Sequence, residues 1–294
     1  MAHAEGVAVT TAFPLATALI VIFAGMLHAT WNALARSTSD RLVTFAIFGV
    51  VEASCGAVGV LLAPAPAVAA WPYLAVSTVL QTLYALFLIR SYRLGDFNQV
   101  YPIARGSAPL LVAIVATLVI GDRTTGPELA GIAVISAGLG VLAFARPRGE
   151  GATPHWPAVR AALLTGAAIA AYTIVDGVGV RLSGSAVGYG SWLFLLMGPP
   201  IVGCALFVHG RNLAGLARTQ LWRRVAGGVL TVAGYAIVLW AQTTGSLAVV
   251  AALRETGVIT GAVIGVFVFR ERAAVARIAA AVTVAAGAAL INLR

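Results

Sequence analysis

Two arginines stand inside apolar segments of this chain. Arg105 lies in YPIARGSAPLLVAIV, and Arg254 lies in LAVVAALRETGVITG. A guanidinium is always charged and binds carboxylate or phosphate through a planar fork of N–H donors. Near the centre of a bilayer a charged side chain costs at least about 2.5–3.5 kcal/mol, so each arginine needs a partner, a ligand or water. Two such groups in one site favour an anionic or zwitterionic substrate.

The two segments also share a pattern. In each, an acidic residue followed by arginine comes at the same spacing after the apolar arginine, as Asp122–Arg123 and as Glu271–Arg272. We therefore interpret the two segments as copies of one repeated unit.

Three carboxylates in apolar segments, Glu52, Asp176 and Glu255, offer a simpler explanation of the arginines. Each arginine could pair with one of them, and pairing could coexist with substrate binding. A carboxylate there could also take up a proton and couple transport to a proton gradient. Asp176 and Glu255 are the better candidates for that role, and Glu52 is the third.

Further polar residues fall on helical faces that could complete a cavity. Residues four positions apart share one face of a helix, and three such pairs are His28 and Asn32, Tyr101 and Arg105, and Tyr172 and Asp176. The expected substrate-binding residues are Arg105, Arg254, Tyr101, His28, Asn32, Tyr172, Gln81, Tyr84 and Tyr235. Trp31, close to a span end, is expected to be an interfacial anchor.

The composition points to a membrane protein. Of the 294 residues, 60% are hydrophobic and 10% are charged, whereas soluble domains carry about 25% charged residues. The apolar runs are about 20 residues long, the helix length that crosses a hydrocarbon core of about 30 Å. The N-terminal stretch lacks the basic start of a signal peptide, so we expect the first run to be a permanent span. The predicted fold class is an all-α polytopic membrane protein.

We predict ten transmembrane helices in two halves, separated by the polar joint ARPRGEGATPHWP. The first repeat covers residues 12–145 and the second covers 157–293. Because each half has an odd number of spans, the second half enters the membrane from the opposite side. Inverted repeats with a site near the midplane are typical of secondary transporters. The predicted spans are 12–35, 42–63, 72–90, 97–120, 127–145, 158–180, 186–208, 224–242, 247–269 and 274–293.

Arginine placement predicts the orientation, because cytoplasmic loops carry an excess of basic residues. With ten spans, Arg123, Arg181 and Arg294 lie on the side of the termini. The opposite side holds fourteen arginines and is expected to be cytoplasmic, so both termini are expected outside. Those arginines are Arg36, Arg41, Arg90, Arg93, Arg146, Arg148, Arg160, Arg211, Arg218, Arg223, Arg224, Arg270, Arg272 and Arg277.

Proline and glycine suggest where helices break and where they pack. Proline removes a backbone donor and kinks a helix, so we expect breaks beside Arg105, at Pro102 and Pro109, and at the GPP of 198–200. The fifth and tenth spans are rich in Gly, Ala and Ser and suit close helix packing. These faces could be buried within the fold or could form a dimer, so a monomer and a homodimer both remain open.

Nearly the whole chain resembles the EamA domain of the drug/metabolite transporter superfamily. The resemblance rests on two five-span repeats, each with a short acidic connection between its fourth and fifth spans (IGDRTTGPELAG and FRERAAVARIAA). HATWNALAR, YRLGDFNQVYPIARGSAPLLV and YTIVDGVGVR resemble a subgroup associated with phosphonate utilisation. The resemblance implies a pseudo-two-fold basket of ten helices around a central cavity. Family members commonly carry a Glu-Pro pair in the second repeat; here Thr256 follows Glu255, so a proline kink is not expected there.

The expected function is secondary transport, in the direction of export, of a small polar metabolite by a protein of the bacterial inner membrane. A flippase for a lipid-linked substrate and a sensor or scaffold without transport are the alternatives. The sequence contains no GxxxxGK, HExxH or CxxC motif, so we expect no enzyme activity, no cofactor and no metal. The expected partners are a small-molecule substrate and the lipid bilayer, and no nucleic acid.

Overall fold

The computed structural model describes residues 14–95, 97–122, 124–144, 156–267 and 275–292. Within these ranges the chain forms helices and no strand. Arg123, Glu271 and Arg272 lie outside the described residues, as do Arg146, Arg148, Arg270 and Arg294. The repeated acidic pattern can therefore be followed only through Asp122.

The first half of the chain forms five long helices. Asp40 caps the second of them, because its side chain accepts a hydrogen bond from the Val43 N–H. A π-helical turn, η2 (Ala116–Ile120), follows the fourth helix and ends at Gly121, whose φ of 74° lies in the left-handed region that favours glycine. The helices are α1 (Leu15–Arg36), α2 (Arg41–Leu62), α3 (Trp71–Leu94), α4 (Phe97–Val115) and α5 (Gly126–Phe144), with a short η1 (Val68–Ala70) before α3.

The second half repeats this order with two differences. A short 3-10 turn, η3 (Gly210–Asn212), and a small helix, α8 (Leu213–Arg218), stand between its second and third long helices. Its fourth segment, predicted as one span over 247–269, is instead two helices separated at Glu255 and Thr256. The remaining helices are α6 (Trp156–Leu182), α7 (Ala186–His209), α9 (Leu221–Thr244), α10 (Leu247–Arg254), α11 (Gly257–Phe267) and α12 (Val275–Ile291).

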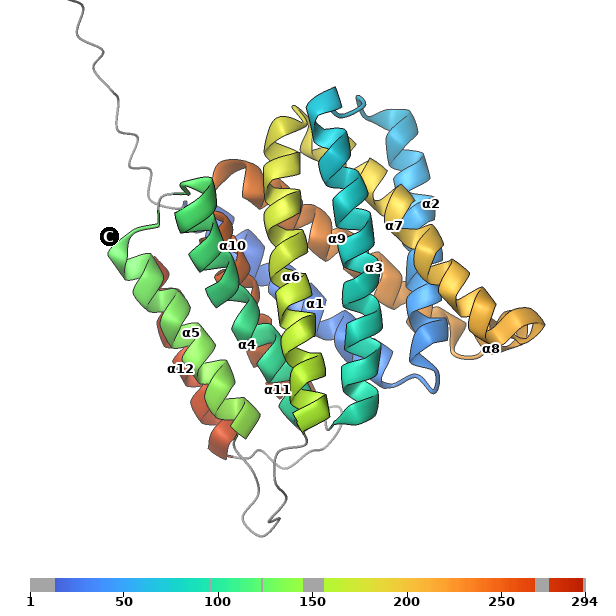
Figure 1. Cartoon of the computed structure of the whole chain (residues 1–294). Helices are drawn as coiled ribbons and strands as arrows, with labels where there is room; N and C mark the ends of the chain where they lie inside the picture. The colour runs from blue at the N-terminus through green and yellow to red at the C-terminus, as the bar shows by residue number, and fades with distance from the viewer. Residues whose placement is uncertain (1–13, 96, 123, 145–155, 268–274, 293–294) are drawn as a thin grey trace, which may run out of the picture.

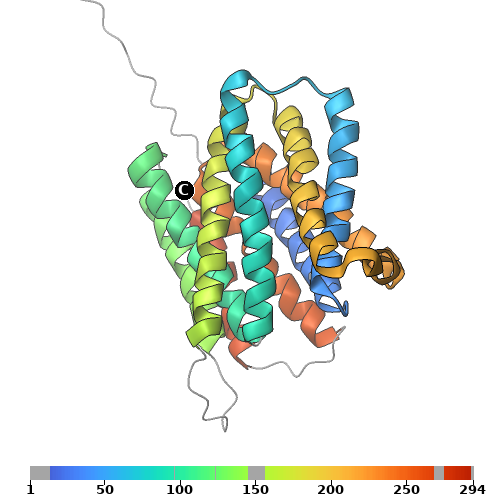
Figure 2. The same ribbon diagram turned by 45° about the vertical axis from the view of Figure 1, so that its right-hand side comes forward.

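The helices pack as a bundle in which most close partners come from different halves of the chain (Figure 1). The pairs α2–α7, α5–α12, α3–α6 and α1–α9 are in extensive contact. In Figures 1 and 2, α5 and α12 lie at one side of the bundle and α2 and α7 at the other, with α3, α4 and α6 between them. The halves are thus interleaved and do not form two separate bodies.

The glycine-rich faces of α5 and α12 are buried against each other. A Cβ added at Gly131 of α5 would stand 2.6 Å from the Gly287 carbonyl oxygen of α12. Such close backbone contact is what small residues permit in membrane helices. The sequence left open whether these faces pack within the fold or form a dimer. In the structure they pack against each other within the fold.

The prolines interrupt neither helix in which breaks were expected. Pro102 and Pro109 lie inside a continuous α4, and Pro199 and Pro200 lie inside a continuous α7. The expectation of breaks at these positions was wrong. Proline is tolerated inside membrane helices, so its presence alone does not end a helix.

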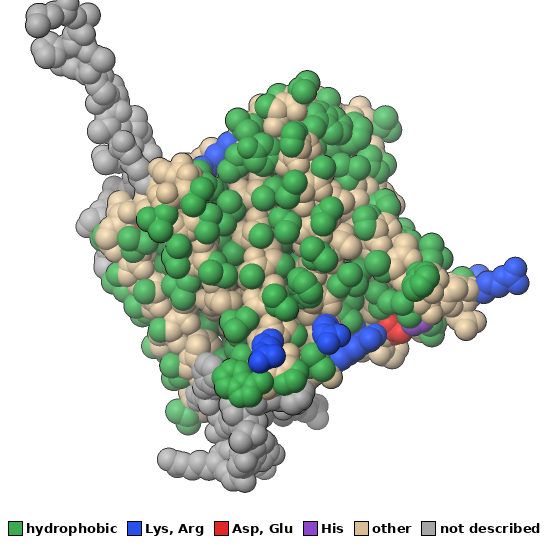
Figure 3. Space-filling view, viewed as in Figure 1, with side chains coloured by type: hydrophobic (Ala, Val, Ile, Leu, Met, Phe, Trp, Pro, Cys, Tyr) green, Lys and Arg blue, Asp and Glu red, His purple; other side chains and the backbone are tan. Residues whose placement is uncertain are grey.

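The described surface fits a lipid environment. Eight helices are long and apolar enough to cross a membrane, counting only the described residues. Hydrophobic side chains cover the face in Figure 3, and large ones such as Phe207 are as much as 93% exposed. The arginine side chains on this face gather mostly along its lower edge and at its right-hand end (Figure 3). The protein is therefore an all-α, multi-pass integral membrane protein.

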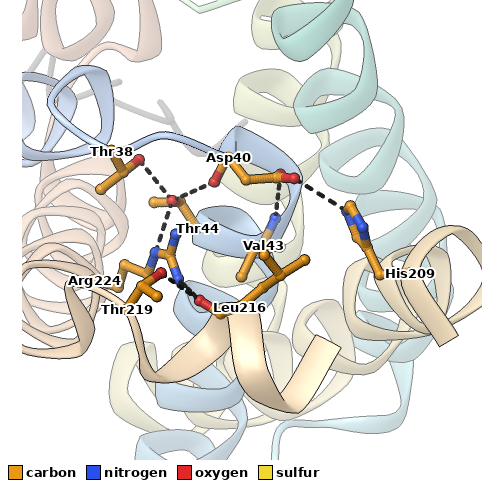
Figure 4. A network of polar contacts seen from close by, with 8 residues as sticks. All are labelled: Thr38, Asp40, Val43, Thr44, His209, Leu216, Thr219 and Arg224. Atoms are coloured by element: carbon orange, nitrogen blue, oxygen red, sulfur yellow. Dashed lines mark hydrogen bonds and ion pairs between the residues drawn. The ribbon is translucent and has the colours of Figure 1, made fainter. Parts of the chain in front are cut away.

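Arg224 was expected at the cytoplasmic end of the span 224–242, and in the structure its side chain is buried, at 1% exposed. Its Nε donates to Thr44 Oγ1 at 3.2 Å, and its Nη1 donates to the Leu216 carbonyl oxygen at 2.5 Å (Figure 4). Thr44 in turn donates to the Asp40 carbonyl oxygen, and His209 Nε2 lies 3.3 Å from Asp40 Oδ2. This network ties the start of α2 to the ends of α7, α8 and α9. Loop charge alone could not predict it, because its partners come from four separate segments.

Candidate functional site

One cavity lies among helices of both halves. The cavity has a volume of about 70 Å³, which is enough to admit water. Seven residues expected at the site line it, from six different helices: His28, Glu52, Gln81, Tyr84, Tyr172, Tyr235 and Arg254. Tertiary packing thus brings together side chains that are far apart in the sequence.

Arg254 is the cationic residue of the cavity lining. It is the last residue of α10 and is 3% exposed, yet among the described residues it forms no ion pair, and its Nε has no hydrogen-bond partner. The backbone behind it is tightly packed against α1: a Cβ at Gly25 would stand 2.6 Å from the Arg254 carbonyl oxygen. The guanidinium is therefore held on a fixed backbone and is available to a ligand.

Arg105 differs from Arg254 in having a partner. Its Nε lies 2.6 Å from Glu255 Oε2, and both side chains are almost fully buried. Arg105 and Glu255 do not belong to the cavity lining. Glu255 follows α10 directly, at the break before α11, so this ion pair joins α4 to the break.

Asp176 is satisfied by neutral donors. Tyr189 donates to its Oδ1 at 2.9 Å, Gln81 donates to its Oδ2 at 3.4 Å, and Tyr235 also donates to Oδ2. Asp176 is fully buried and is not part of the cavity lining, whereas Gln81 and Tyr235 are. Asp176 therefore fixes two lining side chains from behind the cavity wall.

Glu52 is the acidic residue of the cavity lining, and it is 5% exposed. It has no ion-pair or hydrogen-bond partner in the described part of the chain. The sequence analysis ranked Glu52 behind Asp176 and Glu255 as a proton-coupling candidate. The structure separates them: Asp176 and Glu255 have partners within the protein, and Glu52 faces the cavity without one.

His28 and Trp31 form one wall of the cavity. Trp31 Nε1 donates to His28 Nδ1 at 3.2 Å, which leaves His28 Nε2 as the protonated nitrogen of a neutral ring. Trp31 is 4% exposed and packs edge-to-face on Phe45 and Phe48. The expectation that Trp31 is an interfacial anchor was wrong. Its position near a span end could not reveal that α1 turns it toward α2.

Two further expected residues, Asn32 and Tyr101, also lie outside the cavity lining, as Arg105, Asp176 and Glu255 do. Asn32 donates to the His28 carbonyl oxygen at 3.0 Å, so its amide is used within α1. Tyr101 lies on α4, one turn before Arg105. Tyr172, in contrast, lines the cavity and makes edge contacts with Tyr84 and Tyr235.

The sequence reasoning also missed apolar and hydroxyl-bearing parts of the lining. Thr82 and Thr231 contribute hydroxyl-bearing side chains, and Met197 contributes a flexible apolar one. Thr82 adjoins Gln81, and Thr231 lies four positions before Tyr235, whereas no residue of α7 was chosen as a site residue. A helical-face argument extended from Tyr235 could have found Thr231.

Comparison with known proteins supports the fold alone. No family model matches the chain, and no curated protein matches it either. A solved structure described only as "Crystal structure of protein" superposes with a TM-score of 0.68 at 18% identity, over 94% of each chain. At this identity the likeness concerns the fold alone.

Proposed function

We propose that this protein is a secondary transporter of a small polar metabolite, working by alternating access around the described cavity. One observation carries the proposal: Arg254 and Glu52, both buried and unpartnered, line a single cavity inside an apolar helical bundle. An ionisable group within a membrane costs about 2.5–3.5 kcal/mol on insertion scales, and such groups mark substrate or ion pathways. Retaining two of them without internal partners is understandable if a ligand or water meets them.

The proposed architecture is ten spans in two inverted repeats, with α10–α11 and α12 completing the set. Helix contacts support it. In this architecture α1, α2, α3, α4 and α5 correspond to α6, α7, α9, α10–α11 and α12. The contact of α1 with α9 then has its equivalent in the contact of α6 with α3, and the contact of α2 with α9 has its equivalent in that of α7 with α3. The contact of α4 with α6 likewise has its equivalent in the contacts of α10 and α11 with α1. The pairs α2–α7 and α5–α12 map onto themselves, as helices beside a two-fold axis do.

Membership of the EamA family remains our proposal, supported by the motifs and by this pairing. We further propose that the protein lies in a bacterial inner membrane with both termini outside. Arg41 and Arg224 lie at the end of the bundle where α2 begins, and Arg41 donates to the Tyr92 carbonyl oxygen near the end of α3. Arginines at the starts of two separate helices thus lie at one end, as the positive-inside bias favours for the cytoplasmic side.

Transport by purified protein in liposomes tests the proposal. A panel of labelled small carboxylates, phosphonates and amino acids would be screened for saturable, protein-dependent accumulation. We expect at least one compound to be transported, and we expect Arg254→Gln to reduce its transport by about tenfold or more. Arg160→Gln, which changes an exposed arginine of α6, is the matched control. The proposal is rejected if no compound is transported, or if Arg254→Gln transports as well as the control.

A further inference from the structure

The end of α7, together with η3 and α8, projects from the helical bundle. In Figures 1 and 2 this projection extends away from the bundle beyond α2. Its counterpart in the proposed repeat, the connection 63–70 between α2 and α3, contains no charged residue. The projection contains Arg211 and Arg218, and the chain has no acidic residue between Asp176 and Glu255. One half of the protein thus has a basic element that the other half lacks.

The last turn of α7, at the base of the projection, is apolar and uncovered. Leu206, Phe207 and Val208 are 52%, 93% and 61% exposed. Successive residues of a helix point about 100° apart, so this turn is exposed around most of its circumference. The next residue, His209, lies 3.3 Å from Asp40 at the start of the α2 span. The apolar turn therefore lies near the end of the bundle, at the depth where hydrocarbon meets lipid headgroups.

Basic side chains follow this turn along the chain. Arg211 and Arg218 are exposed, and neither has an ion pair or hydrogen bond within the described residues. At the start of α9, Trp222 is 68% exposed and the Arg223 guanidinium carbon lies 5.4 Å from the centroid of its ring. Exposed tryptophan beside arginine is typical of the membrane interface. An open hollow beside Arg211 is lined by Val208, His209, Arg211, Asn212, Gly215 and Leu216.

The protein itself offers these arginines no acidic partner in its described part. Asp40 is the acidic residue that contacts the projection, and its carboxylate is already used. It accepts a hydrogen bond from the Val43 N–H at 3.1 Å and lies 3.3 Å from His209 Nε2. The exposed charge of Arg211 and Arg218 is therefore left for a ligand that carries negative charge.

We propose that the projection binds anionic phospholipid, whose phosphate groups contact Arg211 and Arg218 and whose acyl chains pack on the apolar turn 206–208. The guanidinium fork suits phosphate, and basic residues near the membrane surface attract anionic lipid. A soluble anion or an acidic protein would meet the arginines but would leave the apolar turn uncovered. An anionic lipid has both parts, in the order in which the projection presents their partners. The proposal does not depend on the proposed transport function.

Enrichment of anionic lipid around Trp222 tests the proposal. Trp222 lies beside the projection, because Arg224, two residues later, donates to the Leu216 carbonyl oxygen of α8. The full-length protein is placed in nanodiscs of phosphatidylcholine with a minor fraction of phosphatidylglycerol, and one lipid at a time carries brominated acyl chains. Bromine quenches tryptophan fluorescence on contact, and the signal of Trp222 is the difference between each protein and its Trp222→Phe counterpart. We expect phosphatidylglycerol to be enriched beside Trp222 by on the order of tenfold over random mixing.

Removal of the two arginines gives the sharper result. Arg211→Gln/Arg218→Gln should lower the enrichment by about fivefold or more, because each basic residue contributes to the attraction. Arg90→Gln/Arg93→Gln is the matched control. It removes the same charge from two exposed arginines near the end of α3, which Arg41 joins to the start of α2. The control should keep the enrichment of the unmodified protein.

A soluble headgroup distinguishes a bound lipid from free phosphate. Glycerol phosphate has no acyl chain to pack on the apolar turn, so at millimolar concentration it should leave the enrichment unchanged. The proposal is overturned if phosphatidylglycerol mixes randomly beside Trp222, if glycerol phosphate abolishes the enrichment, or if the two arginine pairs have equal effects. Equal effects would mean that the whole basic edge attracts anionic lipid without a site at the projection. A protein that transports no compound would still show the enrichment, so the two proposals fail separately.

Discussion

The segments around Arg105 and Arg254 look alike in sequence, yet the structure uses them differently. α4 is continuous through Arg105 despite two prolines, and Arg105 is neutralised by Glu255 outside the cavity lining. The second segment breaks into α10 and α11 after Arg254, with no proline there, and Arg254 lines the cavity without a partner. Arg105 joins two helices through an ion pair, and Arg254 lines the cavity without an ion pair among the described residues.

A single residue accounts for the difference. Glu255 follows Arg254, whereas the residue after Arg105 is Gly106. The two arginine segments therefore share one carboxylate, which forms a close ion pair with Arg105 and none within 4.0 Å with Arg254. The two copies of the repeat thus place an arginine at equivalent positions. Only the second copy has a carboxylate after its arginine, and that carboxylate pairs with the arginine of the first copy.

Loss of the ion pair between Arg105 and Glu255 should have the largest effect on stability. Glu255→Gln leaves Arg105 buried without a counter-charge, so we expect the free energy of unfolding to fall by about 3–5 kcal/mol. Chemical unfolding in detergent, followed by circular dichroism, measures it. The double variant Arg105→Gln/Glu255→Gln should recover most of the loss. Glu128→Gln, which changes an acidic residue in the first turn of α5, is the matched control. A Glu255→Gln protein as stable as Glu128→Gln would contradict the assignment of Glu255 as a structural tie.

The tight packing at the break should have a smaller effect. A Cβ at Gly257 would stand 2.3 Å from the Gly25 carbonyl oxygen, so Gly257→Ala must push α1 and α11 apart. Overpacking of this kind costs about 1–3 kcal/mol. Gly261→Ala, four residues later in α11, has no atom within 4 Å of its Cβ and should gain up to about 1 kcal/mol from helix propensity. Equal melting temperatures for the two variants would count against the close α1–α11 contact.

Removal of the unpaired charge should have the smallest effect on stability. Arg254→Gln breaks no ion pair, so we expect the free energy of unfolding to stay the same or to rise by about 1 kcal/mol, because a buried charge is removed. The same unfolding experiment measures it. A loss as large as that of Glu255→Gln would mean that Arg254 is also a structural tie, and the comparison would fail.

Several features followed from the sequence alone. The lengths of the apolar runs predicted a helical membrane protein, because only a helix satisfies every backbone group inside a single segment in lipid. Charged residues within those runs are unfavourable in a bilayer, so they were expected to pair or to belong to a site. These residues are Arg105, Arg254, Glu52 and Asp176. Helical periodicity helped less, because each of the three pairs four positions apart places at most one residue in the cavity lining.

Only the tertiary structure decided which of these charges are neutralised. Pairing depends on which helices adjoin, and Arg105 meets Glu255 because α4 packs against α10, a contact with no local signal in either segment. The same holds for the donors around Asp176, which come from α3, α7 and α9. Helix continuity also differed from what proline predicts, because α4 continues through its two prolines while α10 ends at Arg254 without a proline. The sequence determined where the charges lie along the chain, and the packing of the two halves determined that Arg254 and Glu52 face one cavity unpaired.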